Sequence, residues 1–130
     1  MIQMTNNTKS IELTHQNGIT ILTPMGDTLS YRDIDVQREG MDINQQLKTA
    51  GTQVIIVDMS RSNYFGSLMI GVINSFGQTV KQRNGQMFLC GASDEMQSVL
   101  KIMKLESLWP HFPKLADALK VAKAWKADPK

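Results

Sequence analysis

The chain has 130 residues, of which 42% are hydrophobic and 20% are charged, and its formal net charge is +2 at pH 7. These values are typical of one ordinary folded domain and exclude a disordered chain. No apolar run approaches the ~20 residues of a membrane span, and so small a charge gives no reason to expect a nucleic-acid partner. Because the polar N-terminus lacks the apolar core of a signal peptide, we expect a cytoplasmic protein.

The first predicted element is a β-hairpin. Residues 11–14 alternate between apolar and polar side chains, as in a half-buried strand, and the alternation resumes at Ile19 and Ile21. Asn17-Gly18 lies between the two runs, and both residue types tolerate positive φ, so an antiparallel pair is predicted. Pro24 and Gly26 end the second strand.

A helix is predicted from Ile34 to Leu47. Its apolar stripe consists of Val36, Ile43 and Leu47, with Met41 beside them. Gly40 lies inside it, and an interior glycine costs about 1 kcal/mol relative to alanine. We therefore expect this helix to be short or bent.

The central strand is predicted at Val54–Val57, because this β-branched run is typical of a strand that is covered on both faces. From Leu68 the apolar residues recur every three or four positions, which predicts a helix from Ser67 to Arg83. Asn84-Gly85 is its predicted C-terminal cap. Gly71 and Gly77 inside the helix predict a close approach of the helix to the sheet.

Three further elements complete the predicted order. Residues 87–90 form a buried parallel strand, and Ser93 then begins a helix whose apolar face is Met96, Val99, Leu100 and Met103. Residues 105–112 leave room for a short strand, which Pro110 confines to a sheet edge. The last helix follows Pro113. Its apolar stripe is Leu115, Ala118 or Leu119, Ala122 and Trp125, and its solvated face carries Lys114, Lys120, Lys123 and Lys126.

Together these elements predict an α/β fold. We expect a mixed sheet of about four to five strands, with an antiparallel first pair and a parallel centre, and about four helices. The elements form one domain over residues 11–125, and the termini at 1–10 and 126–130 are expected to be loose.

The residues that usually carry chemistry are scarce. Cys90 is the only cysteine, so no internal disulfide forms, and it is interpreted as a small buried hydrophobe. No Cys/His cluster has metal-site spacing, and His15 and His111 are far apart in sequence. There is no paired-carboxylate or Ser-His-Asp constellation and no glycine-rich phosphate loop. We therefore expect no enzyme activity, no metal and no cofactor.

The order of strand, turn, serine and buried helix resembles the STAS domain family, which includes bacterial anti-sigma-factor antagonists and the cytoplasmic tails of sulfate transporters. The matching residues are Asp58-Met59-Ser60, then Gly66-Ser67-Leu68-Met69 and Ile70-Gly71-Val72-Ile73. The likeness extends to residues 85–93 and 112–119, and it covers about residues 11–124.

The resemblance implies a protein-interaction module that binds a serine kinase acting as an anti-sigma factor. Ser67 falls where antagonists present the serine that the kinase phosphorylates. The implied partner-binding residues are Asp58, Ser60, Arg61, Ser62, Asn63, Tyr64, Gly66 and Ser67. We expect the loop from Ser60 to Phe65 to be exposed with Ser67, while Leu68, Ile70 or Val72 behind them is buried.

Several alternatives remain at this stage. Ser67 alone predicts a helix N-cap, and Asp58 or Ser60 predicts hydrogen bonds within a loop. Gly66 stands where the family pattern carries an acidic residue, which favours a STAS-like scaffold or small-ligand sensor in a signalling or transport assembly, without a phosphorylation switch. Weak self-association is left open.

Overall fold

The computed structural model describes residues 10–25, 33–62 and 66–126. Nine elements follow in chain order: β1 (Ile11–Gln16), β2 (Ile19–Pro24), α1 (Asp33–Ala50), β3 (Val54–Asp58), α2 (Ser67–Lys81), β4 (Gln86–Cys90), α3 (Asp94–Ile102), β5 (His111–Phe112) and α4 (Leu115–Ala124).

The strands form one sheet in the order β1-β2-β3-β4-β5. The pair β1 and β2 is antiparallel, with Gln16 opposite Ile19, and the other neighbours are parallel. Asn17 (φ 55°) and Gly18 (φ 82°) form the tight turn between the first two strands, as their sequence predicts. The predicted fold class is confirmed: β3 is the central strand, and β5 is a short strand at the edge.

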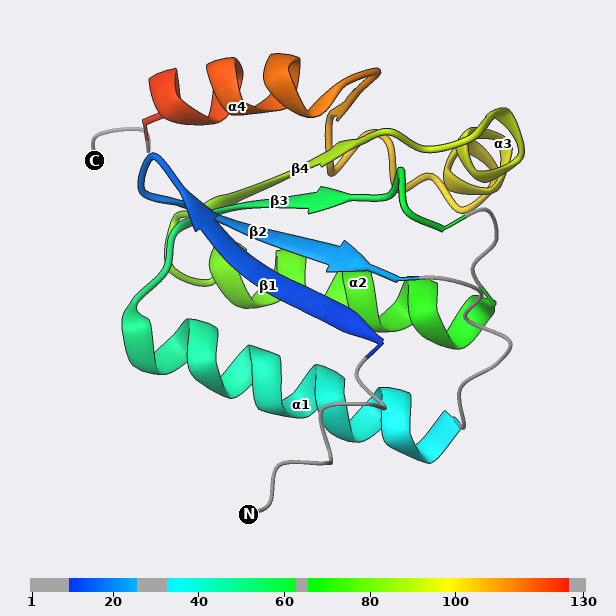
Figure 1. The fold of residues 1–130 in the computed structure, drawn as a ribbon, viewed down its shortest axis with the longest axis horizontal. Coiled ribbons are helices and arrows are strands. Elements are labelled where there is room, and N and C mark those ends of the chain that lie inside the picture. Colours follow the sequence, from blue (N-terminus) through cyan, green and yellow to red (C-terminus); the bar gives the residue numbers. More distant parts are fainter. Residues whose placement is uncertain (1–9, 26–32, 63–65, 127–130) are drawn as a thin grey trace.

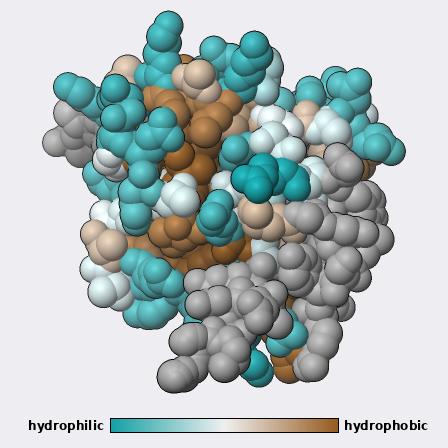
Figure 2. Space-filling view, viewed as in Figure 1, coloured by the Kyte–Doolittle hydropathy of each residue, from teal (hydrophilic) through white to brown (hydrophobic). Residues whose placement is uncertain are grey.

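Helices cover both faces of this sheet (Figure 1). α1 and α2 pack on one face, α4 packs on the other, and α3 lies beyond the carboxyl ends of β3 and β4. Hydrophobic side chains follow the sheet between the two helical layers, whose outer surfaces are mainly hydrophilic (Figure 2). The face under α1 and α2 contains Leu22, Ile55, Val57, Met87 and Leu89, and the face under α4 contains Ile19, Ile21, Ile56 and Phe88.

The expectation that α1 is short is wrong, because it is an 18-residue helix. A Cβ atom on Gly40 would lie 2.7 Å from Cγ1 of Val72, so glycine lets α1 approach α2 closely. Met41 does not belong to the buried stripe, since its side chain is 71% exposed. At about 100° per residue, Met41 lies roughly 140° round the helix from Val36.

The end of α2 also differs from the expectation. The helix ends at Lys81, and the left-handed residue after it is Asn84 (φ 61°). Gly85 has a different role: its N–H donates to the Val80 carbonyl at 2.8 Å, and a Cβ atom there would lie 2.1 Å from the Gln53 carbonyl oxygen. The glycine therefore lets the chain pass closely beside the start of β3.

Most features of the second half are confirmed. The Ser93 hydroxyl oxygen accepts a hydrogen bond from the Met96 N–H at 3.2 Å, which caps α3. Met103 is an exception, because it follows the helix and is 44% exposed rather than packed. α4 buries three residues against the sheet and exposes its lysines; the buried residues are Ala118, Leu119 and Ala122.

Candidate functional site

The carboxyl ends of β3 and β4 bring two loops together (Figure 1). One oxygen of the Asp58 carboxylate accepts hydrogen bonds from the Ser60 N–H at 3.0 Å and from the Ser60 hydroxyl at 2.7 Å. The second loop passes close by, because a Cβ atom on Gly91 (φ +73°) would lie 2.8 Å from the Cβ of Ser60. Asp58 thus holds its loop in place, as the alternative reading of these residues predicts.

Two titratable groups beside these loops are held in uncharged forms. Cys90 is buried at the end of β4; burial, with the Asp58 carboxylate nearby, raises the pKa of its thiol to about 12. His111 on β5 accepts a hydrogen bond at Nε2 from the Ala92 N–H at 3.1 Å, and burial lowers the pKa of its ring. The thiol therefore stays protonated at neutral pH, and the neutral imidazole helps to hold the loop after β4.

The loop after β3 agrees only in part with the sequence prediction. Ser60 and Arg61 are exposed, as expected. The expected exposure of Ser62 is wrong, because this residue is only 6% exposed. Asn63, Tyr64 and Phe65 lie outside the described residues. Gly66 is half-buried and directly precedes α2.

Ser67 is exposed as the first residue of α2, while Ile70 and Val72 are buried and Leu68 is half-buried. The expectation that its hydroxyl caps the helix is wrong: the N-cap is Gly66, and no side-chain hydrogen bond is made from that position. The first turn contains no acidic residue. Among the described residues, the first amides of α2 therefore have no side-chain acceptor.

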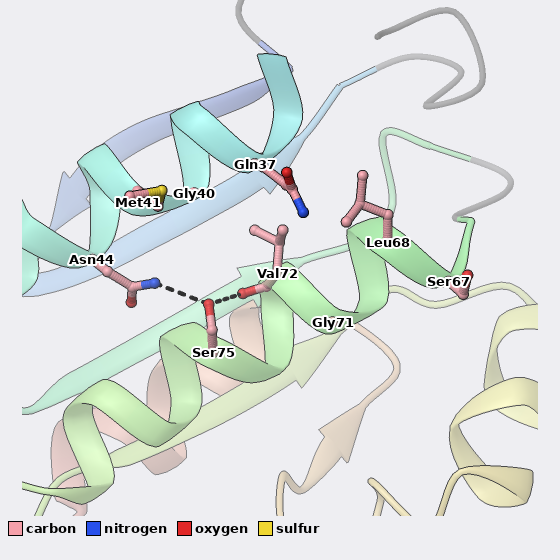
Figure 3. A pocket seen from close by; sticks show the side chains of 9 residues that line it. All are labelled: Gln37, Gly40, Met41, Asn44, Ser67, Leu68, Gly71, Val72 and Ser75. Atoms are coloured by element: carbon pink, nitrogen blue, oxygen red, sulfur yellow. Dashed lines mark hydrogen bonds between the residues drawn. The ribbon is translucent and has the colours of Figure 1, made fainter. Parts of the chain in front are cut away.

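A groove of about 510 Å³ runs between α1 and α2, with Ser67 at one end (Figure 3). We call it the α1–α2 groove, and define it by its lining residues: Gln37, Gly40, Met41, Asn44, Ser67, Leu68, Gly71, Val72 and Ser75. The Gln37 side chain points from α1 towards Leu68 and Val72 on α2. No ionisable side chain is among these nine residues.

The opposite end of the groove is fixed by a hydrogen-bonded cluster. The Asn44 amide donates to the Ser75 hydroxyl oxygen at 2.9 Å, and the Ser75 hydroxyl donates to the Val72 carbonyl (Figure 3). The side-chain oxygen Oδ1 of Asn44 also accepts a hydrogen bond from the Thr79 hydroxyl at 2.7 Å. These bonds tie α1 to α2, so the groove has a rigid wall there.

Sequence reasoning missed the contribution of α1 to this site. It placed Met41 next to the buried stripe and assigned no role to Gln37. The position of Met41 round the helix could have predicted its exposure, because it lies away from the buried stripe. A long apolar side chain on the solvent side of a helix can indicate a binding surface. The pairing of the two helices could not be read from either helix alone.

Two further findings concern the described residues, 10–25, 33–62 and 66–126. None of their helices is both long enough and apolar enough to cross a bilayer. They contain no group of three or more His, Cys, Asp or Glu residues placed to hold a metal ion.

The STAS domain family model matches residues 10–118. The chain belongs to the STAS domain family. A comparison with curated protein sequences gives no match.

Solved structures of anti-sigma-factor antagonists show the same fold. An anti-sigma factor antagonist from Mycobacterium paratuberculosis has a TM-score of 0.71 and 12% identity, over 87% of this chain and 92% of that one. The antagonist SpoIIAA in its unphosphorylated form has a TM-score of 0.73 and 13% identity, over 89% and 98%. SpoIIAA of Bacillus in its phosphorylated form has a TM-score of 0.64 and 15% identity, over 85% and 96%.

Proposed function

We propose that this STAS domain is a signalling module of the anti-sigma-factor antagonist type. It binds a serine kinase that also holds a sigma factor, and phosphorylation of Ser67 releases it. A cytoplasmic location is part of the proposal, since such a partner works where transcription takes place. The observation that carries the proposal is the exposure of Ser67 at the start of α2, where the N-cap Gly66 offers no side-chain hydrogen bond.

The surroundings of Ser67 suit a phosphate group. A phosphate on this hydroxyl lies beside the first amides of α2, which have no side-chain acceptor among the described residues. It also adds nearly two negative charges to a surface that has no acidic residue in the first helical turn. The folded protein therefore tolerates the modification, while a docked partner has to desolvate the new charge.

The docking face extends from Ser67 over the loop after β3. Ser60 and Arg61 are exposed there, and the Asp58 carboxylate fixes the start of the loop. An arginine at the edge of such a face contributes directional hydrogen bonds to a partner's carboxylates. Asn63 and Tyr64 belong to the proposed face by their place in the sequence.

The polar groups at the carboxyl ends of β3 and β4 favour a binding function over a catalytic one. The Asp58 carboxylate is engaged with the Ser60 amide and hydroxyl. The Cys90 thiol has a pKa of about 12 and is buried, so it is a poor nucleophile at neutral pH. Hydrogen bonds thus hold the loops at the carboxyl ends of β3 and β4 in place.

The proposal is tested with Ser67→Asp and Ser67→Ala proteins, immobilised and exposed to an extract of the source cell. Proteins that wild type retains are identified by mass spectrometry, and the affinity of a retained serine kinase is then measured with purified proteins. Ser67→Asp should weaken binding about tenfold or more, because the new charge must be desolvated on docking. Ser67→Ala should bind like wild type.

Gln78→Glu is the matched control, because it adds one negative charge near the other end of α2, where residue 78 is exposed. It should leave the affinity unchanged. Equal affinities of Ser67→Asp, Ser67→Ala and wild type for the kinase would contradict the proposed face. They would favour the alternative of a constitutive STAS scaffold without a switch.

A further inference from the structure

We propose that the α1–α2 groove binds an uncharged amphipathic small molecule, with an apolar chain or ring and one hydrogen-bonding end. Its volume, about 510 Å³, is within the range of roughly 300–1,000 Å³ that is usual for ligand sites. The inference concerns a binding site in the unmodified protein, and its evidence does not rest on the proposed phosphorylation of Ser67.

The surroundings of Gly71 indicate that the groove contains open space, which no side chain of the protein fills. A Cβ atom at this position would meet nothing within 4 Å, although the residue is inside a helix, where glycine is costly. Gly40 on the facing helix is different, because its Cβ atom would collide with Val72. The floor of the groove is therefore formed by close helix packing, and the space above Gly71 is open.

The lining determines the chemistry of the ligand. Met41 is 71% exposed at the rim, and a flexible, polarisable side chain of this kind adapts to different apolar shapes. Leu68 and Val72 provide apolar contacts on α2. Because none of the nine lining residues carries a charge, an ionised ligand would lose its hydration without gaining a counter-charge. The first amides of α2 point along the helix axis, not sideways into the groove.

The Gln37 side chain is free to hold the polar end of the ligand. It points from α1 into the groove, towards Leu68 and Val72 (Figure 3). It has no hydrogen-bond partner among the described residues, whereas Asn44 and Ser75 are already bonded to each other.

The test uses 1-octanol and octanoate, which have the same apolar chain and differ in charge. Each is titrated into the ¹⁵N-labelled full-length protein while amide shifts are followed by NMR. Octanol should give saturable shifts at residues on both walls of the groove, among them Gly40, Met41, Gly71 and Val72. Octanoate should bind about tenfold more weakly, since its carboxylate has no counter-charge. Shifts that do not saturate, shifts spread over the molecule, or equal or tighter binding of octanoate would overturn the proposal.

Variants locate the site. Gly71→Met fills the open space and should abolish the saturable octanol shifts. Lys120→Met is the control, because it places the same side chain on the exposed face of α4, and it should leave these shifts unchanged. Met41→Glu introduces a charge at the rim and should weaken octanol binding about fivefold or more, which keeps the test valid if Gly71→Met fails to fold. Undiminished octanol binding in a folded Gly71→Met or Met41→Glu protein would overturn the proposal.

Discussion

Gly71 and Gly77 lie on the same helix but in opposite surroundings. A Cβ atom on Gly77 would lie 2.5 Å from the Trp109 ring and 2.8 Å from the end of the Met87 side chain. Trp109 cannot move aside easily, because it is 1% exposed and its indole N–H donates to the Asn74 side-chain oxygen at 2.9 Å. Only Gly77 is therefore required by packing, and the expected close approach at Gly71 is wrong.

This difference predicts opposite effects of the same substitution. Gly71→Ala should raise the free energy of unfolding by about 0.5–1 kcal/mol, because alanine is the better helix former and its methyl group meets open space. Gly77→Ala should lower it by about 1–3 kcal/mol, because the methyl group overpacks the core against Trp109. Urea denaturation of the two variants and wild type measures both changes. A loss of stability in Gly71→Ala would show that the space over Gly71 is filled.

At the scale of elements, α2 and α3 begin in different ways although each has a serine at its start. Ser93 is the N-cap of α3 and its hydroxyl oxygen accepts from the Met96 N–H, with Asp94 and Glu95 in the first turn. Ser67 is already inside α2, after the Gly66 cap. The hydroxyl of Ser93 therefore stabilises the fold, and the hydroxyl of Ser67 is available for another role.

Alanine substitutions should separate these two roles. Ser93→Ala should lower the free energy of unfolding by about 1 kcal/mol, the usual cost of losing an N-cap side chain. Ser67→Ala should change it by less than about 0.5 kcal/mol, as for an exposed residue without a hydrogen-bond partner among the described residues. Thermal and urea unfolding of both proteins provide the comparison. A loss in Ser67→Ala as large as that in Ser93→Ala would mean that Ser67 supports α2 after all.

Elements whose structure depends on local chemistry could be predicted from the sequence. The Asn17-Gly18 turn, the β-branched run of β3 and the Ser93 cap each depend on a few adjacent residues. The length of α1 could not be predicted, because Gly40 is explained only by the Val72 side chain of another helix. The burial of Ser62 was missed for a similar reason, since burial in a loop depends on contacts that the local sequence does not show.

At the scale of the whole molecule, the parallel sheet explains why the candidate docking face lies where it does. Parallel β3 and β4 both end on the same side, so the loops that follow them meet there, and α2 begins beside them (Figure 1). Ser67 could be placed at this end from the order of strand, turn and helix. The α1–α2 groove could not, because it requires the relative position of two helices that the sequence shows only separately.

The central claim is that Ser67 switches partner binding, and the most direct measurement is phosphate incorporation by the retained serine kinase. Wild type, Ser67→Ala and Gly66→Asp proteins are incubated with the kinase and ATP, and intact mass and peptide mapping locate any phosphate. We expect one phosphate on Ser67 of wild type and none on Ser67→Ala. Gly66→Asp should incorporate at least as much phosphate as wild type. The phosphorylated protein should no longer bind the kinase. Unmodified Ser67 in wild type, or phosphorylated protein that binds the kinase as tightly as before, would contradict the claim.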